Sequence, residues 1–161
     1  MAYKDEDRRD LREPLGGLLA PVMWCAAQAA VNAGARQTGQ VSVLLVPVPS
    51  SPAARRRRGD APLATLVATA VGSTRSGRDV LRVARRVADQ AGLDAAGRAQ
   101  NLAGAFRATA LGREQLAGRS CVIVDDVITT GATILEAARA IRVVGGHPVA
   151  AAVLAATPRR R

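Results

Sequence analysis

Apolar residues recur along this chain with two different periods, and the change of period predicts where helices and strands lie. Leucines repeat every three or four residues near the amino terminus, which predicts a helix over about residues 7 to 33 with a break near Pro21. The continuous apolar run at 121–124 is typical of a parallel strand covered on both faces. The run at 41–48 predicts the first strand of the main sheet, and the run at 148–156 predicts a further parallel strand. A shorter strand is predicted at 80–84, where Arg82 alternates with apolar positions.

Two further helices are predicted between these runs. The first covers 62–71, where Leu63, Leu66 and Val67 share one face. The second follows the 121–124 strand and ends at a pair of glycines, with Glu136 and Arg139 spaced to form an ion pair across one turn. The portion from 85 to 118 repeats Gly, Ala and Arg without a clear period, so we expect it to be the least regular.

Strands that alternate with helices predict an α/β fold with a mostly parallel central sheet flanked by helices. With 161 residues the chain is long enough for one domain with a sizeable core. We expect an N-terminal helical segment at 1–40, the core at 41–157 and a basic tail at 158–161. Aromatic residues make up only 2% of the chain, so Ala, Val, Leu and Ile must fill that core.

The charge of the chain favours anionic partners. The formal net charge is +10, and it comes almost wholly from arginine because Lys4 is the only lysine. Nucleic acid, polyphosphates and acidic proteins all fit such a balance. The charge alone does not choose among them.

The cysteines and the uncharged stretch from 14 to 35 bear on location. Cys25 and Cys121 lie far apart in apolar surroundings, so we expect both in the core, without a disulfide or a zinc site, and a cytoplasmic protein. Acidic residues outnumber basic ones ahead of the uncharged stretch, which argues against a signal peptide. A membrane span is not expected because the stretch contains Gly16, Gly17, Pro21, Gln28 and Asn32, so no membrane partner is expected either.

Candidate chemistry gathers between Ser120 and Thr133. Asp125 and Asp126 fall where the 121–124 strand is predicted to end, and ligands of open α/β sheets bind at that edge. Three threonines and Gly131 follow and open the next helix, which is a favourable place for a phosphate. Acids suited to hydroxyl groups beside a phosphate cradle together predict a site for a sugar phosphate. A ligand-free βα junction with N-capping threonines is the alternative.

Rival sites find less support. A Walker-type ATPase needs a Gly-Lys-Ser/Thr loop, and Lys4 lies in none. A dinucleotide fingerprint and a nucleophile elbow are both missing from the sequence, and His147 is the only histidine. Too few aromatic residues exist for a stacking groove on single-stranded nucleic acid, although arginines suffice for electrostatic binding.

The segment Val122-Ile123-Val124-Asp125-Asp126-Val127-Ile128-Thr129-Thr130-Gly131-Ala132-Thr133 resembles the phosphoribosyl-pyrophosphate (PRPP) signature of type I phosphoribosyltransferases. Three other blocks resemble the ComF branch of that family: Val46-Pro47-Val48-Pro49-Ser50 with Arg58-Gly59, Gln90-x-Gly92-Leu93-x4-Arg98, and Asn101-Leu102-x-Gly104-Ala105-Phe106. The chain lacks the cysteine-rich N-terminal zinc module that ComF proteins usually carry. Asp60-Ala61-Pro62 also departs from the residues that usually follow Arg-Gly.

This resemblance implies a three-layer type I phosphoribosyltransferase fold with a small N-terminal hood that selects the acceptor. It implies that the two aspartates bind the ribose hydroxyls and favour the cationic sugar, that Mg²⁺ is held mainly through PRPP and water, and that a lid closes over the site. No residue of the chain is assigned as a metal ligand. The implied PRPP-binding residues are Asp125, Asp126, Val127, Thr129, Thr130, Gly131, Ala132 and Thr133; those for pyrophosphate are Val48, Pro49, Ser50, Arg55 and Arg58; the lid cations are Arg85, Arg86 and Arg98.

Three functions remain open at this stage. The first is a transferase that moves ribose 5-phosphate from PRPP to an unidentified base or amine and releases pyrophosphate. The second is a ComF-type accessory protein in DNA uptake that keeps the pocket without turnover. The third is a PRPP- or nucleotide-sensing regulator that binds DNA or RNA through the basic surface. A homodimer is compatible with each of them.

Overall fold

A computed structural model describes residues 12–32, 43–50, 62–71, 77, 79–85 and 95–157. Three parallel strands form the central sheet in the order β1-β4-β5: β1 is Leu44–Pro47, β4 is Ser120–Ile128 and β5 is His147–Ala156. A separate antiparallel pair joins β2, Leu81–Val83, to β3, Phe106–Ala108. The expected α/β class with a parallel central sheet is therefore confirmed.

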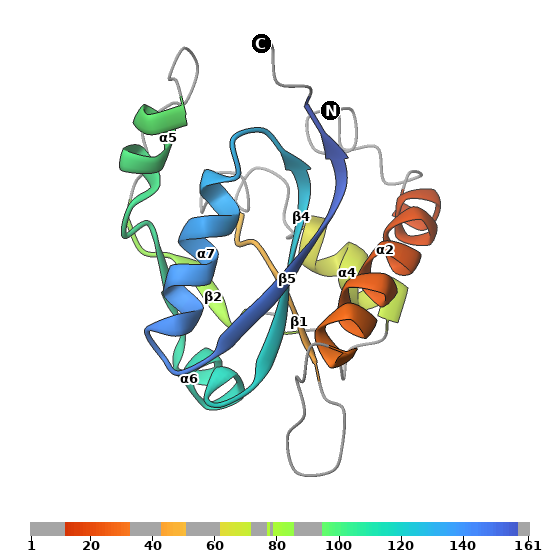
Figure 1. Cartoon of the computed structure of the whole chain (residues 1–161), viewed down its shortest axis with the longest axis horizontal. Coiled ribbons are helices and arrows are strands. Elements are labelled where there is room, and N and C mark those ends of the chain that lie inside the picture. The colour runs from red at the N-terminus through yellow and green to blue at the C-terminus, as the bar shows by residue number, and fades with distance from the viewer. Residues whose placement is uncertain are drawn as a thin grey trace.

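Helices cover both faces of the sheet (Figure 1). On one face lie α2, Arg12–Asn32, and α4, Pro62–Val71, which contact each other and the strands. On the other face lies α7, Ala132–Arg142, with α5, Ala95–Leu102, and the β2–β3 pair beside it. The last helix, α6 (Ala110–Leu116), follows β3.

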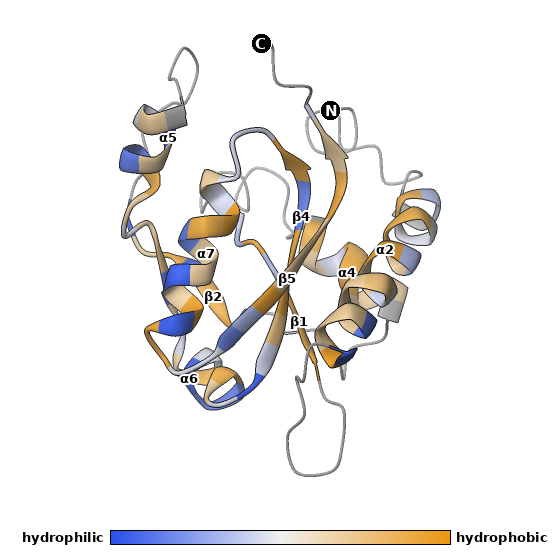
Figure 2. Cartoon of the chain, viewed as in Figure 1, coloured by the Kyte–Doolittle hydropathy of each residue, from blue (hydrophilic) through white to orange (hydrophobic). Residues whose placement is uncertain are grey.

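The core is divided by the sheet into two apolar clusters, because successive strand residues face opposite sides. Cys121 and Ile123 of β4 pack toward α7 and Phe106, whereas Val122 and Val124 pack toward α2 and α4. Apolar colour accordingly follows the strands and the inner helix faces in Figure 2. This alternation determines the side to which each later residue of β4 points.

Helix α2 differs from its prediction in one respect. It continues through Pro21 instead of breaking there. Proline removes the hydrogen bond to the carbonyl of Gly17, four residues earlier, but both residues are exposed, so water can satisfy that carbonyl. By length and composition the stretch Pro14–Asn32 of α2 could cross a membrane, and 22% of it is buried. Its inner face, with Leu19 and Met23, packs against α4 and β5.

The two cysteines lie in different environments. Cys121 is fully buried, as expected, and burial raises the pKa of its thiol to about 11 against smaller opposite effects from the charge of Arg119 and a backbone hydrogen bond at His147. Cys25 is exposed, so the expectation that both cysteines pack in the core was wrong for this one. It lies on the outer face of α2 with Leu18 and Val22, away from the sheet.

The portion from 85 to 118, expected to be the least regular, is described at 85 and 95–118. These described residues contain α5, β3 and α6, none of which was predicted individually. Helix α5 has eight residues, β3 has three and α6 has seven, and elements this short do not show a clear hydrophobic period. The predicted helix at 62–71 is confirmed, and Leu63, Leu66 and Val67 are buried as expected.

Candidate functional site

The carboxyl ends of the three parallel strands meet at one edge of the sheet, beside the start of α7 (Figure 1). The backbone N–H of Val48 donates a hydrogen bond of 2.9 Å to the carbonyl of Val124. That bond joins the loop after β1 to the residue directly before Asp125. The structure therefore brings the predicted loop Val48 to Ser50 together with the predicted aspartates.

Strand β4 extends through both aspartates, which corrects the prediction that it ends at Val124. Asp125 pairs with Val153 of β5, the ladder runs on to Ile128 and Ala156, and the N–H of Thr157 bonds to the carbonyl of Ile128. Because β5 is ten residues long, its backbone supplies partners beyond the apolar part of β4. The acids consequently lie in an ordered strand rather than in a loop.

The position in a strand sends the two aspartates to opposite faces of the sheet. Asp125 continues the α7 side and is buried at 6% relative exposure, whereas Asp126 is half-buried on the other side. One oxygen of Asp125 accepts the N–H of Asp126 at 2.9 Å, and one oxygen of Asp126 accepts the N–H of Val127 at 3.0 Å. These bonds hold one oxygen of each carboxylate close to the backbone.

The loop from 129 to 133 forms the amino-terminal cap of α7. Gly131 is the N-cap and has φ 81° and ψ −1°, a left-handed conformation that favours glycine. No side chain caps this end, and the N–H of Ala132 makes only a long 3.4 Å contact to the hydroxyl of Thr130. The first N–H groups of a helix have no acceptor inside it, so this terminus can donate to an anion. Thr129 is exposed and Thr133 is half-buried.

The predicted lid cations have different situations. The guanidinium of Arg85 donates to the backbone carbonyls of Asn101 and Ala103 at 2.7 Å, so it holds the end of α5. Arg98 lies on α5, and its Nε is buried with no hydrogen-bond partner in the described part of the chain. Arg86, and the predicted pyrophosphate ligands Arg55 and Arg58, lie outside the described residues.

Sequence reasoning missed the environment of Glu136. Its pairing with Arg139 was predicted and is confirmed, with 2.7 Å between Arg139 Nε and Glu136 Oε2. The burial of Glu136 was not predicted, nor was the 2.9 Å hydrogen bond that its carboxylate accepts from the N–H of Phe106. Glu136 lies four residues from Ala132 and four from Ala140, which are both buried. Residues four apart share a helix face, so this spacing was the sequence signal for the burial of Glu136.

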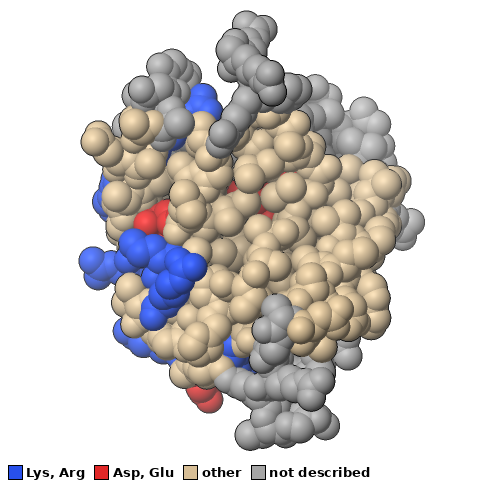
Figure 3. Space-filling view, in the orientation of Figure 1, with Lys and Arg blue, Asp and Glu red and all other residues tan. Residues whose placement is uncertain are grey.

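Positive charge gathers over the α7 side of the molecule in the view of Figure 3. Arg139 and Arg142 contribute to it from the last turn of α7, where the helix dipole stabilises positive charge. The described stretches 14–32 and 147–157, which form most of α2 and all of β5, contain no Asp, Glu, Lys or Arg. The basic surface is therefore confined to part of the described molecule.

Residues 58–161 match the model of the phosphoribosyl transferase domain family. The chain belongs to this family. The match includes β4, the loop 129–133 and α7, so the type I phosphoribosyltransferase-like assignment rests on the fold and on the sequence together.

Shorter segments of the chain are similar in sequence to proteins named as transcriptional regulators. It is 56% identical over 39 residues to transcriptional regulator GfcR 1 of Methanosarcina barkeri, which is 24% of this chain and 19% of that protein. It is 49% identical over 37 residues to transcriptional regulator GfcR of Methanococcoides burtonii, and 54% over 37 residues to that of Halobacterium salinarum, in each case 23% of this chain and 18% of the relative. The matched segments thus span less than a fifth of these relatives.

Proposed function

We propose that this protein binds PRPP together with Mg²⁺ and transfers the ribose 5-phosphate group to a base or amine. The observation that supports it best is the meeting of three parts at one sheet edge: the Asp125–Asp126 pair, the uncapped start of α7 and the loop from Val48 to Ser50. Hydroxyl groups, a 5′-phosphate and a pyrophosphate are the corresponding parts of PRPP. Membership of the phosphoribosyl transferase domain family supports the same reaction class.

In this proposal the carboxylates of Asp125 and Asp126 accept hydrogen bonds from the ribose 2′- and 3′-hydroxyls. The backbone N–H groups at the start of α7, with Thr129, Thr130 and Thr133, hold the 5′-phosphate. The loop 48–50 faces the pyrophosphate, and Arg55 and Arg58 are proposed to reach it as well. Fixing all three parts of the substrate orients the C1 atom toward the acceptor.

The reaction breaks the bond between C1 and the pyrophosphate oxygen, and pyrophosphate leaves with the electron pair. A lone pair of the acceptor nitrogen forms the new bond to C1, and the acceptor proton passes to solvent. Positive charge grows on the ribose in between, where the carboxylates of Asp125 and Asp126 stabilise it. The N-terminal segment is proposed to form the hood that selects the acceptor.

In this proposal the magnesium ion arrives with the substrate. Asp125 and Asp126 at the sheet edge offer carboxylate oxygens, which suit Mg²⁺. Mg²⁺ commonly keeps several waters and takes one or two carboxylates plus substrate phosphates. Bound in this way, it would neutralise charge on the pyrophosphate.

Calorimetric titration with PRPP and Mg²⁺ tests the proposal, followed by pyrophosphate release against a panel of bases and amines. The double variant Asp125→Asn plus Asp126→Asn should abolish measurable binding, and Glu114→Gln, an exposed acid on α6, is the matched control that should keep it. Wild-type protein that does not bind PRPP, or a double variant that binds it normally, would contradict the proposal. Binding without pyrophosphate release for any acceptor favours a sensor.

The second candidate is a regulator that binds nucleic acid and senses PRPP or a nucleotide. It is supported by the GfcR matches, whose proteins are named transcriptional regulators, and by the net charge of +10. Binding to DNA or RNA should then weaken steeply with salt and when Arg55 to Arg58 are neutralised. A salt-independent affinity would exclude this role.

The ComF branch, with a role in DNA uptake, is a further candidate for the same pocket without turnover. It is supported by the Val46-Pro47-Val48-Pro49 and Gln90-x-Gly92-Leu93 blocks. A cytoplasmic location is part of each proposal. Loss of DNA uptake on deletion in a naturally competent host, restored by the Asp125→Asn plus Asp126→Asn variant, would favour a role independent of PRPP.

A further inference from the structure

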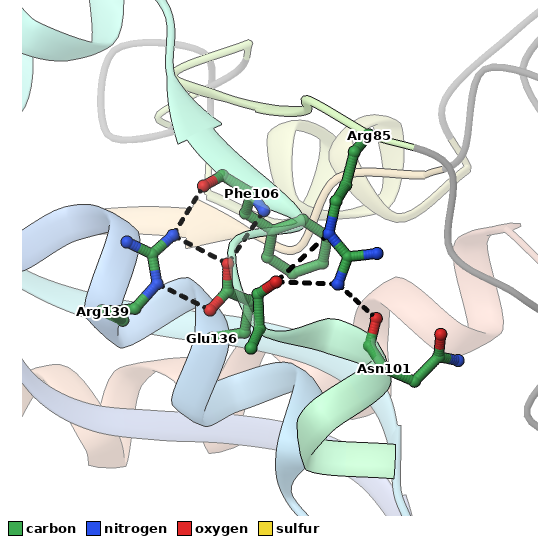
Figure 4. Close-up of polar contacts among 6 residues, drawn as sticks. Arg85, Asn101, Phe106, Glu136 and Arg139 are labelled. Carbon is green, nitrogen blue, oxygen red and sulfur yellow. Dashed lines mark hydrogen bonds and ion pairs between the residues drawn. The ribbon is translucent and has the colours of Figure 1, made fainter. Parts of the chain in front are cut away.

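The segment from 95 to 108, named the arm, contains α5 and β3 and contacts α7. Figure 4 shows that Glu136 and Arg139 of α7 take both backbone polar groups of Phe106. Glu136 Oε1 accepts the N–H of Phe106 at 2.9 Å, and Arg139 Nη2 donates to its carbonyl at 2.9 Å. Two side chains thus take the place that a neighbouring strand would have beside β3.

The contact is built for the charged form of Glu136. Burial by itself would raise its pKa, but hydrogen bonds from Arg139 and from the N–H groups of Phe106 and Gly104, with the charge of Arg139, outweigh burial and lower it. Arg139 binds the carboxylate with two nitrogens, Nε and Nη2, at 2.7 and 2.8 Å. Two-point contacts of this kind fix geometry as well as supplying energy.

A second contact fixes the other end of the arm. Arg85, directly after β2, donates to the carbonyls of Asn101 and Ala103, where α5 ends (Figure 4). A cation at this position satisfies carbonyls that the helix leaves unpaired. The arm is therefore held at Asn101–Ala103 by Arg85 and at Phe106 by Glu136 and Arg139.

The helix that holds the arm, α7, also begins within the loop 129–133, which is called the phosphate loop because it is proposed to hold the 5′-phosphate. Glu136 lies one turn after Ala132, the first residue of α7, and α5 contacts α7 directly. On α5, Arg98 has a buried Nε without a partner in the described part of the chain. An unsatisfied buried donor is costly, and an anion beside it would remove that cost.

We propose that Glu136 is a positioning residue for the phosphate loop: with Arg139 it holds the arm against α7, so that Arg98 is placed to meet the anionic ligand of this loop. This inference rests on the proposed function, because it needs a phosphate-bearing ligand at the start of α7. Glu136 itself does not touch that ligand. It acts through the arm.

The central test is Glu136→Gln, measured by calorimetry with PRPP and Mg²⁺ and by hydrogen exchange of the arm with and without that ligand. The variant keeps the shape of the side chain but loses the charge that binds Arg139. We expect wild-type exchange in the arm to slow on ligand binding, and we expect the variant to lose this protection and about fivefold or more in affinity. Arg98→Gln should lose a similar affinity while its unfolding midpoint is unchanged.

Two controls separate positioning from general stability. Leu19→Val weakens the apolar cluster on the opposite face of the sheet, and Arg142→Gln removes an exposed charge from the last turn of α7. Both should bind PRPP as the wild type does. If Glu136→Gln does not fold, Arg139→Lys replaces it as the test, since it keeps the charge but loses the two-point contact.

The outcomes distinguish this inference from the proposed function. Normal binding and normal protection of the arm in Glu136→Gln and Arg139→Lys overturn the positioning role and leave the PRPP site intact. The same holds if Leu19→Val loses as much affinity as they do. Wild-type protein that binds neither PRPP nor ribose 5-phosphate overturns the proposed function, and the positioning role with it.

Discussion

Asp125 and Glu136 are equally buried, at 6% relative exposure, yet they lie in different parts of the molecule. Glu136, on α7, receives hydrogen bonds from Arg139 and Phe106, two residues of the protein that lie on different elements. Asp125, on β4, accepts the N–H of Asp126 and lies where the carboxyl ends of the parallel strands meet. We propose a ligand-binding role for Asp125 and a positioning role for Glu136, so burial alone does not predict the role of a carboxylate.

The largest expected effect is on PRPP affinity, which should depend more on Asp125 and its neighbour Asp126 than on Glu136. Asp125→Asn and Asp126→Asn should each weaken PRPP binding by roughly 10- to 100-fold, because a hydrogen bond to a charged group contributes about 1.5–3 kcal/mol. Calorimetry measures the affinity, and urea denaturation should show little change for the half-buried Asp126. The comparison fails if Glu136→Gln weakens binding more than either substitution.

The next effect separates them by stability. Glu136→Ala should lower the free energy of unfolding by about 2 kcal/mol, because it leaves the N–H of Phe106 buried without an acceptor and separates the arm from α7. Urea denaturation measures this loss. Glu114→Ala, on the exposed side of α6, is the control and should change stability by less than about 0.5 kcal/mol. Equal stability of the two variants would show that the contacts of Glu136 contribute nothing.

Two glycines extend the comparison from side chains to the backbone. Gly131 and Gly145 both have positive φ, 81° and 79°, and they lie at opposite ends of α7. Alanine at either position should cost about 1–2 kcal/mol of stability through the left-handed conformation. Only Gly131→Ala should also weaken PRPP binding, since only that residue lies in the phosphate loop. Calorimetry with both variants checks this. Equal PRPP affinities of the two variants would show that the loop 129–133 does not bind the ligand.

Sequence patterns predicted the parallel sheet and the 62–71 helix, because apolar runs and helical periods are local features. They missed the extension of β4, which depends on the length of β5 as its partner. They also missed the arm, whose elements are too short for a period, and the burial of Glu136, which is decided by what packs against α7. The ion pair with Arg139 was readable because a helix fixes its spacing, while the bond to Phe106 joins residues 30 apart.

The smallest expected effect is a dependence of stability on pH. Because the pKa of Glu136 is lowered in the folded protein, its contribution is fully present above the ordinary value of 4.5 and is lost as the pH falls through the lower, folded value. Thermal unfolding of wild type and Glu136→Gln should therefore differ most at neutral pH and converge below about pH 4.5. A constant difference between wild type and Glu136→Gln would mean that the contact does not depend on the charge of Glu136, and the distinction from Asp125 would then rest on position alone.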